Sequence, residues 1–406
     1  MLKLTSPATV VVLAALTALG PLATDMYLPA MPAMAGALDT GPDQVQLTLS
    51  LYMAGFALAQ LFCGPVSDRY GRRPVMIAGI ALFLLASLLC AFAPSIEWLL
   101  VGRFLQAFGG AAGPVLGRAA VRDIHGPLEA GRILSYMAST MALAPALAPV
   151  LGAGLLLFFG WEAIFVALSF YAAMMLLVLA FLMPEPLPAE NRQSIHPATI
   201  LRNYRMLLGQ RAFIGYTLVN ACGFAGLFAF LSGSSFVLIE FMGLTPFQYG
   251  IGFTLIVAGF FTGTLISGRY SHRLGRDRLL LLATLMCALA GGTMAILALA
   301  AVYAPWAVVG PHILFLIGFG IVMPQSMSGA LAPNPQCAGS ASSLFGFLQM
   351  TIAALGGALV GQFHDGTSRT MAIAIGLGGL LSLVAYLGLV RMRRVEVPQT
   401  VPARRE

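Results

Sequence analysis

The sequence predicts an all-α membrane protein with twelve transmembrane helices, arranged as two pseudo-symmetric halves of six helices each. The composition is apolar, twelve apolar stretches are long enough to cross a bilayer, and one charged segment occurs once in each half. Apolar residues make up 59% of the chain and charged residues 9%, and the mean hydropathy is +0.89. A chain of this composition cannot cover itself with a water-facing surface, so we expect the lipid bilayer as its surroundings.

Each apolar stretch holds about 20 residues or more, enough to cross a hydrocarbon core about 30 Å thick. These stretches divide the chain into an N-terminal half at 1–183, a proline-rich linker at 184–210, a C-terminal half at 211–392 and a tail at 393–406. We expect a short surface helix in the linker near 198–208. The predicted spans are 7–32, 46–64, 74–93, 97–122, 132–157, 161–183, 211–238, 246–268, 278–301, 307–330, 340–363 and 368–391.

The basic residues are distributed unevenly about these spans. Of the 22 Lys and Arg, all but Arg103 and Arg369 fall on the side that carries residues 64–73. The positive-inside rule assigns that side, and with it both termini, to the cytoplasm. The net charge of +7 is therefore explained by membrane topology, and we expect no nucleic-acid partner.

The segment at 64–73 has a second copy at 268–277, about half the chain away. The two copies agree at both glycines, at the serine and at two arginines. A parallel duplication of this kind is typical of a large transporter architecture. Two unrelated turns are the alternative, because membrane loops favour Gly and Arg. We interpret the first copy as a charged turn between two apolar runs.

Asp25 is the one acid predicted deep within a span, where a carboxylate costs about 2.5–3.5 kcal/mol. Pro29 and Pro32 are predicted to end that span at the outer face, which places Asp25 about 10 Å below it. Arg103 is predicted at a similar depth, about 9 Å from the same face. Burial favours the neutral acid, whereas a nearby guanidinium favours the ionised one, so Asp25 is a candidate for proton exchange. A permanent structural ion pair is the alternative.

Other polar residues follow helical faces. Gln46, Ser50 and Gln60 form a stripe in the second span, for which a helix–helix contact is favoured over a cavity lining. Polar residues on one face of the seventh span are explained either by a hydrogen-bonded contact between helices or by a wall that contacts substrate, and both explanations remain open. The candidates for a substrate cavity are Tyr52, Gln106, Tyr216 and Asn220.

The sequence lacks the motifs of several enzyme classes. It has no phosphate-binding loop, no zinc-protease motif and no nucleophile elbow, so we expect neither an enzyme nor an ATP-driven pump. The five cysteines fall in spans or at their ends without paired spacing, which indicates small core residues. No metal or cofactor is expected.

Three segments carry a resemblance to a known family. Residues 64–73 are similar to the loop motif between spans 2 and 3 of the major facilitator superfamily. Residues 102–109 resemble its span-4 motif, and residues 148–153 resemble its antiporter motif in span 5, with alanines where the pattern prefers glycines. Residues 25–29 and 46–52 resemble the drug:proton antiporters of the bicyclomycin and chloramphenicol resistance type. The resemblance covers nearly the whole chain.

The resemblance implies a major facilitator fold and proton-coupled export of a small, mostly apolar drug by alternating access. It also implies a monomer in the bacterial inner membrane. Proton coupling is assigned to Asp25 and Arg103, and the antiporter motif to Pro145, Pro149 and Gly152. The resemblance assigns a conformational latch to Gly64, Asp68, Arg69, Gly71, Arg72, Arg73 and Asp123.

In that latch, Asp68 would contact the start of span 11 near Gly339, and Arg72 would pair with Asp123. These contacts would hold while the outside is open and break when the inside opens. The second copy has His272 in place of Asp68, so it is expected to lack the same latch.

Two other functions remain open. One is a proton-coupled or facilitative importer of a metabolite on the same fold, although such carriers usually show more polar and aromatic cavity residues. The other is a non-transporting receptor or regulator, against which the short termini argue.

Overall fold

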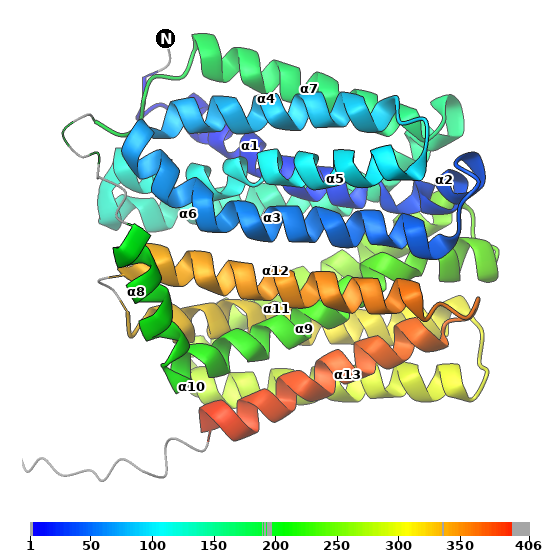
Figure 1. Ribbon diagram of the computed structural model, residues 1–406. Coiled ribbons are helices and arrows are strands. Elements are labelled where there is room, and N and C mark those ends of the chain that lie inside the picture. The colour runs from blue at the N-terminus through cyan, green and yellow to red at the C-terminus, as the bar shows by residue number, and fades with distance from the viewer. Residues whose placement is uncertain (1–2, 189, 191, 193–196, 335–336, 392–406) are drawn as a thin grey trace, which may run out of the picture.

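The computed structural model describes residues 3–188, 190, 192, 197–334 and 337–391. Within these residues the fold is helical and contains no strand. The helices run roughly side by side, and Figure 1 shows the N-terminal half stacked on the C-terminal half. The first half contains α1 (Pro7–Asp25), α2 (Met31–Ala37), α3 (Pro42–Tyr70), α4 (Arg72–Ala91), α5 (Ile96–Gly110), α6 (Ala112–Phe159) and α7 (Glu162–Phe181).

The linker contains α8 (Pro197–Leu208), which lies across one end of the bundle (Figure 1). The surface helix expected near 198–208 is thus present. A π-helical turn at Phe236–Phe241 follows the first helix of the second half, and another at Tyr386–Val390 follows the last. The second half contains α9 (Arg211–Ser235), α10 (Pro246–Leu299), α11 (Pro305–Leu331), α12 (Ala338–Gln362) and α13 (Arg369–Ala385).

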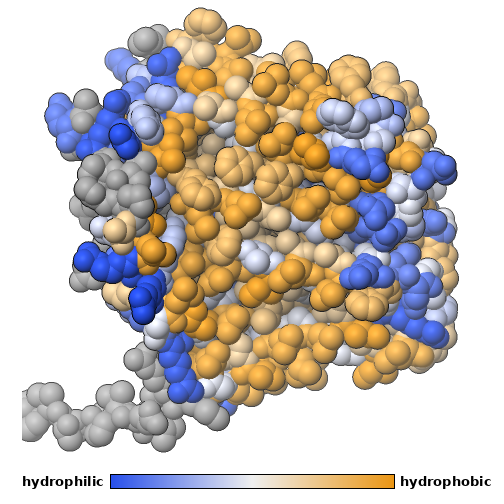
Figure 2. Space-filling model, viewed as in Figure 1, coloured by the Kyte–Doolittle hydropathy of each residue, from blue (hydrophilic) through white to orange (hydrophobic). Residues whose placement is uncertain are grey.

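The lengths and composition of the helices confirm a multi-pass membrane protein. In the part of the chain that the structure describes, 11 helical stretches are long and apolar enough to span a bilayer, and Ala144–Phe159 is a shorter apolar helix. That shorter helix lies where the fifth span was predicted. On the face of the bundle shown in Figure 2, apolar side chains cover a wide middle zone, and polar residues gather at the two ends. We call the end that carries α8, Gly71 and Gly275 the basic end.

The first span differs from its prediction. Pro29 and Pro32 do not end it, because a short 3-10 turn at Leu28–Ala30 leads directly into α2, and the whole span covers Pro7–Ala37. Proline is tolerated in the first turn of a helix, where its missing N–H has no partner to lose. Asp25 therefore lies at a break inside the span, 12 residues before its last residue, Ala37, rather than seven residues before its end.

The segment 64–73 is also less of a turn than predicted. Residues 64–70 form the last turns of α3, with Pro65 inside the helix, and α4 begins at Arg72. The chain reverses at Gly71, whose φ is 99°, a conformation that strongly favours glycine. Gly275 in the second copy has a φ of 73° and interrupts α10 in the same way. The two copies therefore share a backbone turn, as expected from a duplication.

The two halves contact each other closely toward the end opposite the basic end. The Ser232 hydroxyl of α9 donates to Gln46 Oε1 of α3 at 3.2 Å. The Thr254 hydroxyl of α10 donates to the Ala146 carbonyl of α6 at 2.7 Å. Gln46, Ser50 and Gln60 are buried, and α3 packs along α12. Gln46 and Ser50 thus lie at a contact with α12, as predicted for that stripe, whereas Gln60 also lines a cavity between the halves.

Candidate functional site

Arg103 lies at the centre of the N-terminal half and is completely buried. Its guanidinium lies 4.5 Å from the ring centroid of Tyr27 and 4.3 Å from that of Tyr52. It donates hydrogen bonds to the Ala23 carbonyl at 2.9 Å and to Gln106 Oε1 at 2.6 Å. Its Nε and second terminal nitrogen have no hydrogen-bond partner among the described residues. Aromatic faces and neutral oxygens thus stabilise this cation instead of a carboxylate.

Asp25 is the last residue of α1 and is 6% exposed. Its carboxylate accepts a hydrogen bond from the Thr24 hydroxyl at 3.0 Å. The described residues show no ion pair between Asp25 and Arg103, although Arg103 bonds the carbonyl of Ala23, two residues before the acid. The two charged groups therefore lie at one level of the bundle without being paired, and the alternative of a permanent ion pair does not describe this conformation.

Tyr52 lies against Arg103. Its ring faces the guanidinium, and its buried hydroxyl has no hydrogen-bond partner in the described part of the chain. Tyr52 was predicted to line a substrate cavity, and the structure places it beside the buried charges. Sequence reasoning gave no role to Tyr27, whose ring also packs on Arg103 and whose hydroxyl lies 2.5 Å from that of Thr48. The position of Tyr27, two residues after Asp25, is the sequence feature that could have indicated its place beside the buried charges.

The antiporter-like segment of α6 packs directly against the break after α1. A methyl group added at Gly152 would overlap the backbone carbonyl of Met26, the residue that follows Asp25. Pro149 is buried and Pro145 is half-buried, and α6 continues through both prolines. Glycine at position 152 is therefore what allows α6 to approach the chain beside the buried acid.

The predicted latch residues form a network at the basic end. The Arg72 guanidinium pairs with Asp123 at 2.8 Å, as the resemblance implied, and with Asp68 at 2.6 Å. Asp68 thus contacts Arg72 of its own loop, while Gly64, Gly339 and Ser340 lie around the same cavity. Among the described residues, no hydrogen bond or ion pair joins Asp68 to the start of α12 in this conformation.

Glu185 holds the same loop in place and was missed by sequence reasoning. Its carboxylate accepts hydrogen bonds from the backbone N–H groups of Arg72 at 2.7 Å and Arg73 at 3.1 Å, which caps the start of α4. The Arg73 side chain donates in turn to two carbonyls at the end of α7. Arg69 makes a weaker contact, with its guanidinium 5.2 Å from the Tyr70 ring centroid. Glu185 lies between two prolines directly after the sixth span, and this is the sequence feature that could have indicated a fixed position for its side chain.

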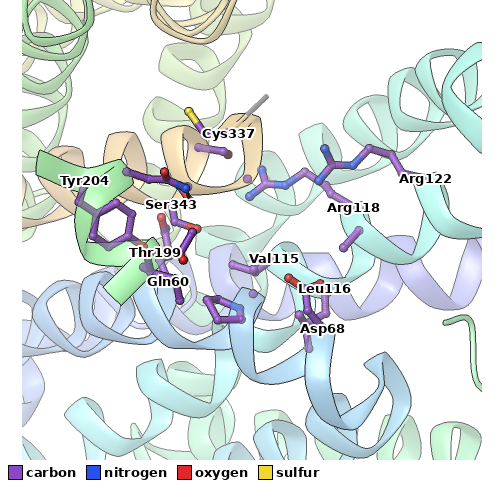
Figure 3. A pocket seen from close by; sticks show the side chains of 18 of the residues that line it. Gln60, Asp68, Val115, Leu116, Arg118, Arg122, Thr199, Tyr204, Cys337 and Ser343 are labelled. Atoms are coloured by element: carbon purple, nitrogen blue, oxygen red, sulfur yellow. Dashed lines mark hydrogen bonds between the residues drawn. The ribbon is translucent and has the colours of Figure 1, made fainter. Parts of the chain in front are cut away.

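A cavity of about 480 Å³ lies at the basic end between the two halves. Its walls come from α3, α6, α8 and α12, so both halves and the linker contribute (Figure 3). Arg118 and Arg122 are exposed to it. The polar residues of its lining are Gln60, Asp68, Arg72, Arg118, Arg122, Thr199, Asn203, Tyr204, Ser340, Ser342 and Ser343.

None of the four predicted substrate-cavity residues lines this described cavity. Gln106 binds Arg103 and donates to the Ser87 hydroxyl at 2.8 Å, and Asn220 donates to Gln349 of α12 at 2.9 Å. Tyr216 is half-buried, with the Arg276 guanidinium 5.8 Å from its ring centroid. Asn220 thus takes part in a seam between helices, and contact of these residues with a substrate stays a prediction.

Comparison with known proteins identifies the fold and its family. Residues 13–360 match the family described as Major Facilitator Superfamily. The chain belongs to this superfamily. It is therefore a transporter of small molecules in a membrane rather than an enzyme, as the motifs predicted.

Related superfamily members cover nearly the whole chain. A bicyclomycin resistance protein homolog from Haemophilus influenzae is 31% identical over 93% of this chain and 94% of its own length. Multidrug resistance protein D from Escherichia coli is 30% identical over 92% and 93%.

Solved structures of other transporters share the fold. A bacterial homolog of the human lysosomal transporter Spinster has a TM-score of 0.74 at 16% identity, covering 95% of this chain and 98% of its own. A D-xylose-proton symporter has a TM-score of 0.72 at 13% identity, with the same coverage. At these identities the likeness shows the arrangement of helices alone.

Proposed function

We propose that the protein is a proton-driven exporter of small, mostly apolar drug-like molecules. It works as a monomer by alternating access, in the inner membrane of a bacterium. The names of the relatives from Haemophilus influenzae and Escherichia coli support drug export. The observation that carries proton coupling is the buried, unpaired arrangement of Asp25 and Arg103 around Tyr52.

The basic end faces the cytoplasm in this proposal, as the distribution of Lys and Arg supports. The cavity at that end then makes this conformation inward-facing, since the halves are joined toward the opposite end by Ser232–Gln46 and Thr254–Ala146. The position of Asp68 agrees with this state, because its contact with α12 is expected only while the outside is open.

The proton acts through the charge of Asp25. A buried carboxylate is costly in the membrane interior, so proton uptake removes that cost, whereas ionisation draws Asp25 toward the Arg103 guanidinium. Arg103 has two nitrogen groups free to receive such a partner, and the Tyr52 hydroxyl can donate to the ionised acid. Protonation thereby changes the relative stability of two arrangements of α1 and α5, which is the requirement for shifting a two-state equilibrium.

Transport by purified protein in vesicles with an imposed pH gradient tests the proposal, with a panel of antibiotics as probes. Wild-type protein should move a drug against the flow of protons. Asp25→Asn should lose uphill transport while retaining drug exchange down its own gradient. Normal transport by Asp25→Asn with unchanged pH dependence would remove the proton role. Movement of substrate together with protons would favour the importer, and no flux in any condition would favour a receptor.

A further inference from the structure

Two arginines of α6 that make no ion pair among the described residues lie in the wall of the cavity at the basic end. Arg118 and Arg122 are one helical turn apart, and their guanidinium groups repel each other. Figure 3 shows both side chains extending from α6 across the cavity toward the beginning of α12, where Cys337 lies. Like charges placed this way destabilise a helix unless something of opposite charge lies between or beside them.

The nearby carboxylates are already engaged elsewhere. Asp68 and Asp123 both pair with Arg72, at 2.6 and 2.8 Å. Among the described side chains, no ion pair reaches Arg118 or Arg122. The cavity therefore keeps an excess of positive charge in a place where a bound molecule would be partly shielded from water.

The facing wall adds hydrogen-bond donors and the positive end of a helix. The 25-residue helix α12 begins at Ala338, and its cap residue Cys337 makes no side-chain hydrogen bond to the first turn. The hydroxyls of Ser340, Ser342 and Ser343 lie in the same lining, together with Asn203 of α8. Serine hydroxyls and free N–H groups at a helix start are good ligands for an anion, and guanidinium groups bind carboxylate, sulfonate and phosphate strongly.

We propose that this cavity binds the anionic group of substrates entering from the basic end, so that the transporter selects acidic amphiphiles and excludes cations. This assignment of substrate class rests on the proposed export function. Arg118 and Arg122 hold the anionic group, while the half-buried Val115 and Pro65 of the same lining contact the apolar part. A volume of about 480 Å³ suits a drug-sized molecule. The headgroup of an anionic phospholipid has the same chemistry and is the other possible source of the ligand.

Two fluorescent probes with one aromatic skeleton provide the test. Anilinonaphthalene sulfonate is anionic, and phenylnaphthylamine is its neutral counterpart without the sulfonate. Binding is titrated to full-length protein in phosphatidylcholine nanodiscs, with empty nanodiscs subtracted. The double variant Arg118→Gln/Arg122→Gln should bind the anionic probe about tenfold more weakly, because charge-assisted hydrogen bonds are lost. Binding of the neutral probe should change by less than about twofold, and Arg202→Gln, on α8 outside the cavity lining, should behave like wild type.

Equal weakening of both probes, or no weakening of either, would overturn the assignment. The same titration in nanodiscs containing phosphatidylglycerol, an anionic phospholipid, distinguishes a substrate anion from a lipid headgroup as the ligand of the two arginines. If this lipid abolishes the difference between wild type and the double variant, the arginines bind a headgroup and the substrate assignment is wrong. A difference that persists supports it. Proton-driven transport of the antibiotic panel in vesicles reports on the proposed export function separately, so that failure of anion selectivity and failure of export can be distinguished.

Discussion

Residues 64–73 and 268–277 make the same backbone turn with different side-chain partners. Gly71 and Gly275 have φ values of 99° and 73°, and each lies directly before an arginine. Arg72 pairs with two carboxylates, whereas Arg276 donates to the Ser328 hydroxyl at 3.1 Å. The duplication has thus kept the backbone turn in both copies, while the two described ion pairs of the arginine after the glycine belong to the first copy.

The centres of the two halves differ in the same way. The first half buries Asp25 and Arg103, and the second half places the neutral pair Asn220 and Gln349 at 2.9 Å. Buried charge is costly in a membrane, whereas a neutral amide pair costs less, even with Asn220 Oδ1 lacking a hydrogen-bond partner among the described residues. In the proposed mechanism, the first half carries the proton chemistry and the second half responds to it through packing. Matched substitutions in the two halves can test this division of roles.

The largest expected effect is at Arg103. Arg103→Ala removes the only buried cation between Tyr27 and Tyr52 in the described structure, and it leaves the Gln106 oxygen without that donor. Proton-driven efflux should fall to the level of protein-free vesicles while the protein remains in the membrane. Asn220→Ala, the matched change in the second half, removes one interhelical hydrogen bond and should lower the rate by less than about threefold. Both rates are measured in vesicles with a pH jump, and preserved efflux by Arg103→Ala would contradict the division of roles.

The two arginines of the repeated turn should give the next largest difference. Arg72→Ala leaves Asp68 and Asp123 without their shared partner and should slow transport about tenfold. Arg276→Ala loses a contact to a neutral hydroxyl and should change the rate by about twofold or less. The two variants are compared by their initial efflux rates, normalised to the amount of protein in the vesicles. Equal effects would show that both copies act as latches.

The smallest expected difference concerns the two glycines. Alanine at either position must adopt a positive φ together with a ψ near 156° or 159°, a combination essentially restricted to glycine, which costs about 1–3 kcal/mol. At Gly71 the added methyl would also lie 2.6 Å from Glu185 Oε2, whereas at Gly275 it would meet no atom within 4 Å. Gly71→Ala should therefore lower the melting temperature of the purified protein more than Gly275→Ala. The reverse order would mean that the loop around Glu185 can move aside freely.

The fold could be predicted largely from composition and spacing. Apolar stretches and the repeated glycine turns reveal a duplicated helical membrane protein, since both follow from the chemistry of the bilayer and of positive φ angles. The end of the first span could not be read from Pro29 and Pro32, because a proline in the first turn of a new helix resembles a proline that ends an old one.

The candidate site was predicted only in part. A lone buried acid and a buried arginine stand out in an apolar sequence, so Asp25 and Arg103 were found. The contacts around them depend on which helices pack together, which a single sequence does not reveal. For the same reason Tyr27 and Glu185 were missed. The sequence also does not show that Arg118 and Arg122 face a cavity, because the opposite walls come from α8 and α12, which are distant in sequence.

The most direct test of the account is the charge state of Asp25 during transport. Infrared difference spectroscopy on the reconstituted protein can follow the carbonyl band of a protonated carboxyl group, assigned to Asp25 through its loss in Asp25→Asn. The account predicts that this band changes when a transported drug is added or when the pH gradient is reversed. A band that stays constant under both conditions would contradict proton exchange at Asp25, and with it the proposed mechanism.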